Sequence, residues 1–430
     1  MDDREICLLN DSFPPVIDGV ANAVVNYARV ISASGRSVSV VTPQFPGADD
    51  SAWSYPVIRY PSIDLRKSLG YTAGNPFNIP TLLELKQRNI CLLHSHCPVM
   101  SNTLARSLRE AMDVPLIMTY HTKFDIDISN AIKSKGLQTS AIKALVDSVG
   151  ACDELWVVSE GAGQNIRHLG YEGEYIVMPN GVDTPKHRVP DDEILKATAG
   201  YDLPENVPVF LFVGRLMWYK GLRLILDALA ALRSQRLDFR MVFIGGGGDE
   251  TEVKQYVEEL KLGDKVIFTG RISDRGVLSA WYCRADLLLF PSTFDTNGLV
   301  VREAAACSLG TVLVGGSCAA EGVSDGVDAL LIDENAASLA VCLARIMDDR
   351  GAMRRIGEKA ADDLYYSWDD SVKHAMERYE VVLDNYRRGV YSKRRRFSDE
   401  MFALSGELID FLATAGERKN LIEEKLERYL

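Results

Sequence analysis

The 430-residue sequence lacks a long apolar run, a cysteine pair at metal-binding spacing and a broad basic region. No apolar stretch reaches the ~18–20 residues that a transmembrane helix needs, so we expect no membrane span. The net charge of −12 argues against nucleic acid as a partner, because binding to phosphate backbones needs an extended basic surface. The start of the sequence, MDDREICLLN, also lacks the basic residues and apolar core of a signal peptide. We therefore expect a cytoplasmic chain.

The eight cysteines are scattered, and none forms a C-x-x-C pair. Most of them lie within or beside apolar runs, which is typical of reduced, buried thiols in a cytoplasmic protein. They are Cys7, Cys91, Cys97, Cys152, Cys283, Cys307, Cys318 and Cys342. A zinc site is not expected.

Short apolar runs alternate with amphipathic segments along most of the chain. EICLLN and PLIMTYHT are typical of buried strands, and Ala21–Ala33 and Ser101–Met112 are typical of helices. This alternation predicts an α/β fold built from βαβ units, with parallel sheets covered on both faces. The alternation restarts with VPVFLFVGR, so we expect two doubly wound, Rossmann-like domains that face each other across a cleft. Ligands bind in such clefts at the carboxyl ends of the strands.

Composition suggests five segments. We expect an N-terminal Rossmann-like domain at 1–190, a proline-containing linker at 191–207 and a C-terminal Rossmann-like domain at 208–365. A helix at 366–390 is expected to return to the N-terminal domain, and a basic, amphipathic helical extension occupies 391–430. The extension combines four consecutive basic residues with apolar residues at helical spacing. That pattern fits packing on its own protein, self-association or membrane contact.

Two cations follow the first strand of the second half. Gly214 and Arg215 come directly after LFV, and Lys220 lies near the start of the next predicted helix. Guanidinium and ammonium groups beside a helix N-terminus pair with phosphate oxygens, and the helix dipole favours the same anion. Either cation alone would be an ordinary residue on a solvated loop, but together with the motifs that follow they indicate a diphosphate site.

Two carboxylates, Asp295 and Glu303, stand eight positions apart in DTNGLVVRE. We expect Asp295 on a loop after a strand and Glu303 on the helix that begins near Gly298. The N–H groups of Asn297, Gly298 and Leu299 would then be free at the start of that helix. A carboxylate accepts hydrogen bonds from vicinal hydroxyls, so we expect Asp295 to bind a sugar and Glu303 a ribose.

GRLMWYKG, GGGG and the D-x7-E of DTNGLVVREA together resemble the retaining GT-B glycosyltransferases of family 4, and the resemblance extends to about residue 389. The family pattern is E-x7-E, and Asp295 stands where a glutamate is usual. The resemblance implies transfer of a sugar from a nucleoside diphosphate donor to an acceptor, with no metal or other cofactor. It gives the N-terminal domain the acceptor and the C-terminal domain the donor. The implied catalytic residues are His121, Arg215, Lys220 and Asp295, and the implied donor-binding residues are Gly19, Gly214, Arg215, Lys220, Asp295, Asn297, Gly298, Leu299 and Glu303.

The N-terminal half carries two further matches to the family. Gly19 lies on a loop where the family brings a glycine backbone close to the donor. His121 follows the strand PLIMT and matches a His-Thr pair at the catalytic centre, where it is expected to position the sugar. His94 and His96 resemble a recurrent His-x-His near the cleft, although packing would explain them equally well.

The acceptor is suggested by a narrower resemblance, carried by DGVA, HT-x-x-D and DTNGLV, to bacterial diacylglycerol glucosyltransferases and related glycolipid synthases. It implies glucose transfer from UDP-glucose to a lipid such as diacylglycerol at the inner face of the membrane. Arg66, Lys67, Lys133 and Lys135 are the expected contacts with anionic lipid, and each is equally consistent with an ordinary solvated residue. Two alternatives stay open. One is family-4 transfer to a saccharide or undecaprenyl-linked acceptor; the other is a sugar-nucleotide epimerase or nucleotide-sugar binding protein of the same architecture.

Overall fold

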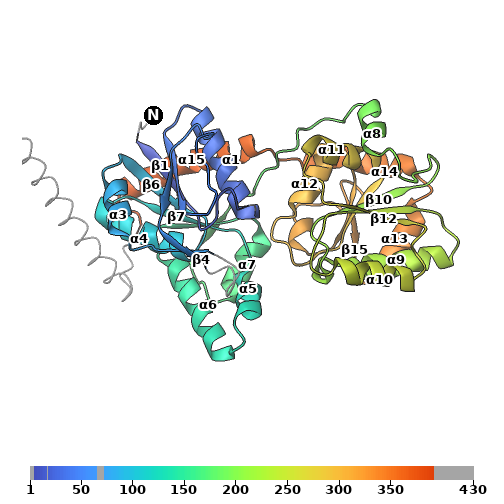
Figure 1. Ribbon diagram of the computed structural model, residues 1–430, viewed down its shortest axis with the longest axis horizontal. Helices are drawn as coiled ribbons and strands as arrows, with labels where there is room; N and C mark the ends of the chain where they lie inside the picture. The colour runs from blue at the N-terminus through green and yellow to red at the C-terminus, as the bar shows by residue number, and fades with distance from the viewer. Residues whose placement is uncertain (1–3, 17, 65–71, 392–430) are drawn as a thin grey trace, which may run out of the picture. The chain divides into compact units, whose positions relative to one another are not determined.

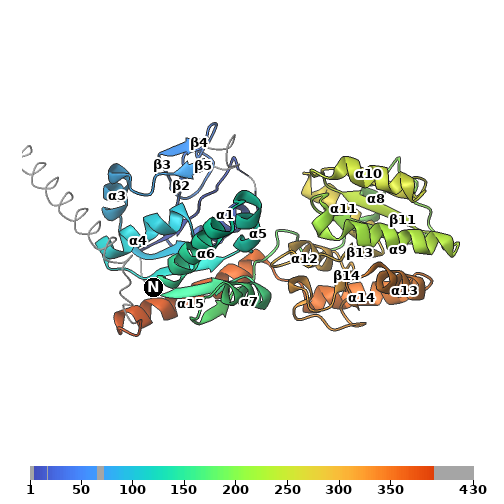
Figure 2. The same ribbon diagram turned by 90° about the horizontal axis from the view of Figure 1, so that it is seen from below.

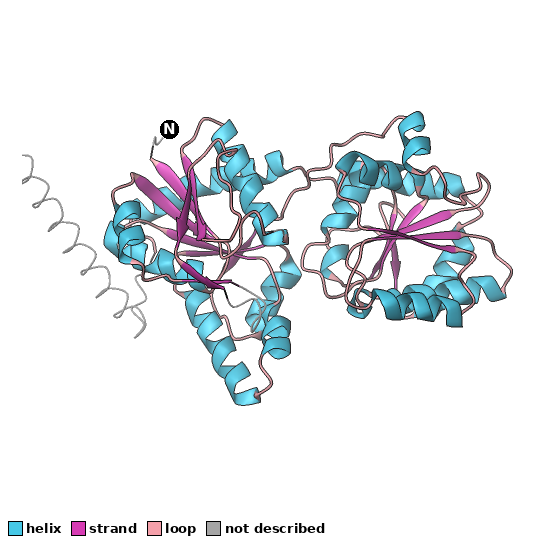
Figure 3. Cartoon of the chain, viewed as in Figure 1, coloured by secondary structure: helices cyan, strands magenta, loops and turns pink. Residues whose placement is uncertain are grey.

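The computed structural model of the chain describes residues 4–16, 18–64 and 72–391. These residues form two compact units (Figure 1). The first unit contains the described residues up to Pro179 and those from Ser371 onward, and the second is Asn180–Asp370. Each unit holds a parallel sheet with helices on both faces, as the colouring by secondary structure makes clear (Figure 3). The predicted α/β fold with two Rossmann-like sheets is confirmed.

The sheet of the first unit has seven strands in the order β3-β2-β1-β6-β7-β8-β9, all paired in parallel. The strands are β1 (Glu5–Leu9), β2 (Val38–Pro43), β3 (Val57–Tyr60), β6 (Ile90–Ser95), β7 (Leu116–Tyr120), β8 (Glu154–Val157) and β9 (Tyr175–Val177). A separate antiparallel pair joins β4 (Ser62–Asp64) to β5 (Thr72–Gly74). Strands such as β1 and β7 are buried along their whole length, which explains their near-continuous apolar sequences.

Seven helices are described around this sheet. They are α1 (Gly19–Ala33), α3 (Ile79–Lys86), α4 (Met100–Met112), α5 (Phe124–Ala131), α6 (Lys135–Gly150), α7 (Glu160–His168) and α15 (Trp368–Arg387). The last of these begins in the second unit, and its residues from Ser371 onward belong to the first. Within the first unit Arg378 of α15 pairs with Glu154 of β8 at 2.6 Å, and Tyr379 is fully buried. The helix expected at 366–390 is therefore part of the core of the first unit.

The sheet of the second unit has six parallel strands in the order β12-β11-β10-β13-β14-β15. The strands are β10 (Val209–Val213), β11 (Arg240–Ile244), β12 (Val266–Gly270), β13 (Leu287–Phe290), β14 (Thr311–Val314) and β15 (Leu330–Ile332). The helices are α8 (Asp191–Ala197), α9 (Leu222–Ser234), α10 (Glu250–Glu259), α11 (Arg275–Arg284), α12 (Leu299–Ala306), α13 (Ala336–Ile346) and α14 (Arg350–Asp363), with 3-10 turns η1 (Trp218–Lys220) and η2 (Cys318–Ala320). Figures 1 and 2 show α9, α10 and α13 along one face of this sheet and α11, α12 and α14 along the other.

The segment 191–207, expected as a linker, lies inside the second unit. Its first seven residues form α8, and Ile194 of this helix is 4% exposed in the apolar core of the unit. Pro190 precedes the helix, and three acidic residues occupy its first turn, where the positive end of the helix dipole favours them. The proline just before this segment therefore marks a helix start and not a flexible connection.

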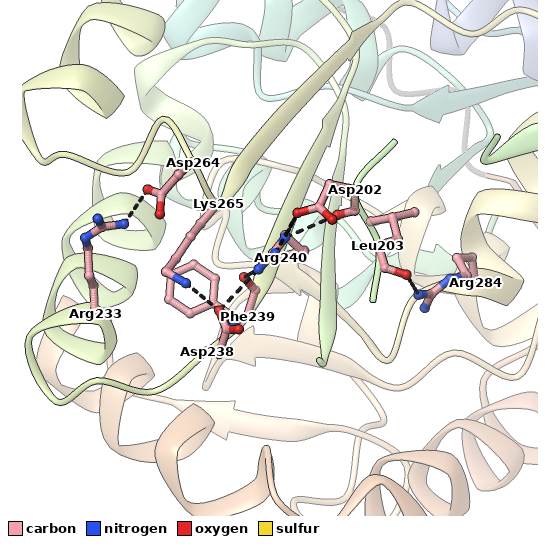
Figure 4. A network of polar contacts seen from close by, with 9 residues as sticks. All are labelled: Asp202, Leu203, Arg233, Asp238, Phe239, Arg240, Asp264, Lys265 and Arg284. Carbon is pink, nitrogen blue, oxygen red and sulfur yellow. Dashed lines mark hydrogen bonds and ion pairs between the residues drawn. The ribbon is translucent and has the colours of Figure 1, made fainter. Parts of the chain in front are cut away.

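Polar contacts hold the amino-terminal edge of the second sheet (Figure 4). Arg240, the first residue of β11, pairs with Asp202 at 2.6 Å. Arg284, the last residue of α11, donates a hydrogen bond to the carbonyl oxygen of Leu203 at 3.0 Å. The segment after α8 is thereby attached to the ends of two elements, which fixes the edge opposite to the carboxyl ends of the strands.

The expected membrane contacts fall partly outside the described residues. Arg66, Lys67 and the predicted extension from residue 392 onward belong to this part of the chain. Lys133 and Lys135 are described, and both are exposed at the start of α6. Among the described residues, no helix is long and apolar enough to cross a bilayer.

Candidate active site

Lys220 and Asp295 meet at the carboxyl edge of the second sheet. Lys220 ends η1, directly after the loop that follows β10, and is 8% exposed. Its Nζ atom lies 2.5 Å from Oδ1 of Asp295, which follows β13. The hydroxyl of Ser292 donates to the other carboxylate oxygen of Asp295 at 2.5 Å. The structure thus joins two residues of the expected set that are 75 positions apart in the chain.

Arg215 stands two residues after β10 and is exposed. Gly214 precedes it and donates its N–H to the carbonyl oxygen of Ile244 at 3.0 Å, which anchors the start of this loop. The guanidinium carbon of Arg215 and Nζ of Lys220 lie 6.0 Å and 5.6 Å from the ring centroid of Tyr219. In the part of the chain that the structure describes, no carboxylate pairs with Arg215. Two cations near one aromatic ring, of which only Lys220 pairs with a carboxylate among the described residues, favour an anionic ligand.

The start of α12 lies beside this charged group. Gly298 precedes the helix with φ of 55°, and a Cβ atom there would come within 2.9 Å of the Cβ of Ala319, so only glycine fits. No side chain of a described residue caps the helix, and the N–H of Leu299 belongs to the first turn, which has no intrahelical acceptors. Nδ2 of Asn297 is buried without a hydrogen-bond partner among the described residues. This helix start therefore offers several donors to an anion.

Glu303 lies on the second turn of α12 and is held by α11. Its Oε2 accepts a hydrogen bond from the hydroxyl of Tyr282 at 2.8 Å, and its Oε1 accepts one from Arg275 at 3.1 Å. Burial raises the pKa of the Glu303 carboxyl above its usual value, and the bonds from Tyr282 and Arg275 oppose that shift. The sequence did not point to Tyr282 or Arg275, because their proximity to Glu303 depends on how α11 packs against α12.

Three buried histidines occupy the carboxyl ends of two strands in the first unit. His121 follows β7, and its Nε2 lies 3.0 Å from Nδ1 of His96. His94 of β6 bonds to the hydroxyl of Tyr379 at 2.6 Å and to that of Thr119 at 2.7 Å. Burial lowers the pKa of all three imidazoles, that of His121 to about 3. They are therefore neutral at pH 7 and act through hydrogen bonds.

Gly19 is the first residue of α1. The preceding Asp18 caps this helix, and its Oδ1 accepts hydrogen bonds from the N–H groups of Val20 at 2.9 Å and Ala21 at 2.7 Å. A Cβ atom at Gly19 would meet no described atom within 4 Å. Packing against the described residues therefore does not require glycine here. Gly19 and His121 belong to the first unit, and the other expected catalytic and donor-binding residues belong to the second.

Two family models match the chain. "Glycosyltransferase Family 4" matches residues 17–186, and "Glycosyl transferases group 1" matches residues 195–363. Among curated relatives, the D-inositol 3-phosphate glycosyltransferase of Streptomyces bingchenggensis is 30% identical over 315 residues, which cover 69% of this chain and 68% of the relative. The alpha-monoglucosyldiacylglycerol synthase of Acholeplasma laidlawii is 22% identical over 341 residues, which cover 77% of this chain and 85% of the relative.

Solved structures share the fold. Sucrose-phosphate synthase from Thermosynechococcus elongatus superposes with a TM-score of 0.73 at 21% identity, over 89% of this chain and 99% of that one. Anabaena HepE, solved with UDP and glucose, gives a TM-score of 0.68 at 19% identity, over 87% and 99% of the two chains. The relatives favour a transferase over the epimerase or binding protein that the sequence left open. The chain therefore belongs to glycosyltransferase family 4: it is a sugar-transferring enzyme with the GT-B fold.

Proposed function

We propose that this enzyme transfers glucose from UDP-glucose, with retention of the anomeric configuration, to a lipid acceptor such as diacylglycerol at a membrane surface. The observation that carries the proposal is the group at the carboxyl edge of the second sheet, where Lys220 touches Asp295 beside Arg215 and the uncapped start of α12. Anabaena HepE, which has the same fold, was solved with UDP-glucose. Two curated relatives are named alpha-monoglucosyldiacylglycerol synthase, which supports the lipid acceptor.

In the proposed reaction, the donor diphosphate takes the place of Asp295 as the main partner of Lys220. Arg215 and the N–H groups at the start of α12 bind the remaining phosphate oxygens. Negative charge grows on the diphosphate as its bond to the sugar breaks, and donors already fixed in place stabilise that charge without reorganising. Asp295 is then available for the sugar hydroxyls. The leaving phosphate oxygen takes the proton of the acceptor hydroxyl, so no protein base is required.

Glu303 is assigned to the ribose hydroxyls. Each of its oxygens already accepts one hydrogen bond, and a carboxylate oxygen accepts two, so capacity for two hydroxyls remains. We assign His121 and Gly19 of the first unit to the transferred sugar on the family resemblance. A neutral imidazole suits that role, because it both donates to and accepts from a hydroxyl.

Glu303→Ala is expected to raise the KM for the donor by about 5- to 30-fold, the equivalent of ~1–2 kcal/mol for a lost hydrogen bond to a charged group. The turnover number should change little if the bond is equally strong in the ground state and the transition state. Initial rates over a range of donor concentrations measure both constants. Tyr282→Phe keeps the carboxylate but removes one of its supports, so it should produce a smaller rise; an unchanged KM in Glu303→Ala would remove this residue from the donor site.

The acceptor is tested by a transfer assay with UDP-glucose, UDP-galactose, UDP-GlcNAc and GDP-mannose. Each donor is supplied with and without vesicles that contain diacylglycerol and an anionic lipid. We expect a glucolipid from UDP-glucose that forms only in the presence of vesicles. Donor hydrolysis at the same rate with and without vesicles would contradict a lipid acceptor. A preference for another donor would contradict glucose as the transferred sugar.

A second candidate acceptor is a phosphorylated polyol. Two curated relatives that are 30% identical to this chain are named D-inositol 3-phosphate glycosyltransferase, and their alignments cover about 70% of this chain. The same four donors with inositol 3-phosphate in place of vesicles distinguish this acceptor from diacylglycerol. A saccharide or undecaprenyl-linked acceptor gives product in neither assay.

Lys133→Glu with Lys135→Glu is expected to weaken binding to anionic vesicles. Both lysines are exposed, and Leu137 beside them on α6 is 62% exposed, so cations and an apolar side chain share this surface. A cation near an anionic bilayer contributes about 1 kcal/mol, so removal of two should lower the affinity by at least ~10-fold at low salt. Vesicle sedimentation measures this, with Lys373→Glu on α15 as the matched control. Equal binding of the double variant and the control would contradict contact through this surface.

A further inference from the structure

Cys283 and Cys307 lie at the ends of neighbouring helices in the second unit. Cys283 is the next-to-last residue of α11, Cys307 follows the last residue of α12, and they are 5% and 2% exposed. The bond between Tyr282 and Glu303 joins the same two helices, one residue before Cys283 and one turn before Cys307. The two thiol groups interact directly with each other.

A pocket of about 540 Å³ is lined by both cysteines. It lies at the amino edge of the sheet, opposite to the edge that carries Lys220 and Asp295. Its wall includes four arginines, Arg188, Arg284, Arg350 and Arg354. Arg284, which follows Cys283 directly, is fixed by its bond to the Leu203 carbonyl (Figure 4). The pocket thus brings small polar reagents next to the two cysteines without passing the candidate active site.

The surroundings of Cys283 stabilise its thiolate. The N–H of Val189 donates to Sγ at 3.4 Å, and Arg188, which bonds to the Cys283 carbonyl oxygen at 3.0 Å, places a cation nearby. The hydrogen bond from Cys307, these two neighbours and His187 lower the pKa of the Cys283 thiol to about 6, against the effect of burial. The pKa of Cys307 is raised, because its thiol interacts with Cys283, is buried and lies near Glu303.

Four other cysteines differ from Cys283 in the direction of their pKa shift. Burial raises the pKa of the Cys7 and Cys152 thiols to about 12, and it also raises the pKa of Cys97 and Cys342. At pH 7 these thiols are protonated and inert. Cys283 is therefore a nucleophilic sulfur at neutral pH with a second sulfur as its direct neighbour.

We propose that Cys283 and Cys307 form an oxidation-sensitive dithiol that a hydroperoxide converts into an intrachain disulfide. The Cys283 thiolate attacks one peroxide oxygen, the O–O bond breaks, and the departing oxygen leaves as hydroxide or alkoxide and takes up a proton. The sulfur of Cys307 then attacks the resulting sulfenic acid, loses its proton and forms the S–S bond as water leaves. Two electrons pass from the two thiols to the peroxide, and hydrogen peroxide is thereby reduced to two molecules of water.

The disulfide has a consequence for donor binding, and this consequence rests on the proposed function. A covalent S–S bond of about 2.05 Å draws the ends of α11 and α12 closer than a hydrogen bond holds them. The contact between Tyr282 and Glu303 lies next to Cys283 on α11 and one turn from Cys307 on α12, so we expect the Glu303 carboxylate to change position. We therefore expect oxidation to raise the KM for the donor and a reductant to restore it.

Mass mapping of the full chain tests the dithiol without any activity assay. Protein treated with hydrogen peroxide, alkylated and digested should yield a peptide that joins Cys283 to Cys307. In untreated protein, alkylation of Cys283 by iodoacetamide should rise around pH 6, whereas Cys7, which is fully buried, should react only after unfolding. Alkylation of Cys283 no faster at pH 7 than that of Cys342, or a disulfide between other cysteines, would overturn the proposal.

Two variants make the order of steps visible. Cys307→Ser keeps a donor to Cys283 but removes the second sulfur, so a sulfenic acid should accumulate on Cys283 and react with dimedone. Cys342→Ser, also buried, is the matched control and should still form the disulfide. If the disulfide forms while the donor KM stays constant, the link to Glu303 is wrong. If untreated enzyme turns over none of the donors, the proposed function fails. Mass mapping of the disulfide still tests the dithiol proposal, because it needs no activity.

Discussion

Lys220→Ala is expected to lower kcat by about 100- to 1000-fold, the loss that follows removal of one fixed donor to transition-state charge. Lys220 is positioned by Asp295 before any ligand arrives, and its aromatic neighbours limit its movement. The KM for the donor should change less than kcat, because the charge on the diphosphate is greatest in the transition state. Steady-state kinetics with UDP-glucose measure both constants.

Two controls separate catalysis from folding. Lys254→Ala breaks a lysine–carboxylate pair of similar length, 2.7 Å to Glu250, on the surface of α10, and should leave kcat unchanged. Lys220→Ala removes the cation that pairs with the partly buried Asp295 carboxylate, which lowers thermal stability. The double variant with Asp295→Ala should therefore recover thermal stability without recovering turnover. Normal turnover in a folded Lys220→Ala enzyme would remove this lysine from the mechanism.

The free energy of unfolding of the first unit is expected to fall steeply below pH 6.5. The pKa values of His94, His96 and His121 are lowered in the folded state, so protons bind the unfolded chain first. The stabilisation is fully present above the unfolded pKa of about 6.5, and it is lost as the pH falls toward the folded values, about 3 for His121. Each imidazole that remains neutral contributes a slope of about 1.4 kcal/mol per pH unit.

Urea unfolding at a series of pH values measures the slope of the free energy of unfolding against pH. A range of about pH 7.5 to about pH 5 lies above most carboxyl titrations. His96→Asn should reduce the slope by the contribution of one proton, about 1.4 kcal/mol per pH unit, because one buried imidazole is removed. His374→Asn is the matched control, since His374 is exposed on α15. A slope that is the same in all three proteins would show that the buried histidines bind protons equally in the folded and unfolded states.

The fold was largely predictable from the sequence because a buried parallel strand has a plain signature. The run VFLFV is apolar throughout and EICLL is apolar after Glu5, and burial of every residue in β1 and β10 explains why. The segment 191–207 was misinterpreted for a physical reason as well. Proline and acidic residues favour both loops and helix starts, and only the contact of Ile194 with the core decides between them.

The candidate site was predictable only where its residues lie in local motifs. Asp295, Gly298 and Glu303 fall within nine residues of sequence, so a pattern reveals them together. The partners that fix them do not: Tyr282 reaches Glu303 from another helix, and the bond between His94 and Tyr379 spans 285 positions. Such contacts arise from the packing of helices against each other and from the return of α15 to the first unit. Neither leaves a recognisable motif in the local sequence.

The course of α15 has a consequence for how the protein is made. Residues from Ser371 onward complete the first unit: the Ser371 hydroxyl bonds to the Pro179 carbonyl oxygen, Arg378 binds Glu154, and Tyr379 fills the space beside His94. A ribosome therefore delivers the last piece of the first unit only after it has synthesised the whole of the second. Synthesis of the second unit at ~5–20 residues per second takes roughly 10–40 s. During this time His94 in the nascent first unit lacks its contact with Tyr379. During that interval the second unit can fold first, so the order of folding can run opposite to the order of the chain.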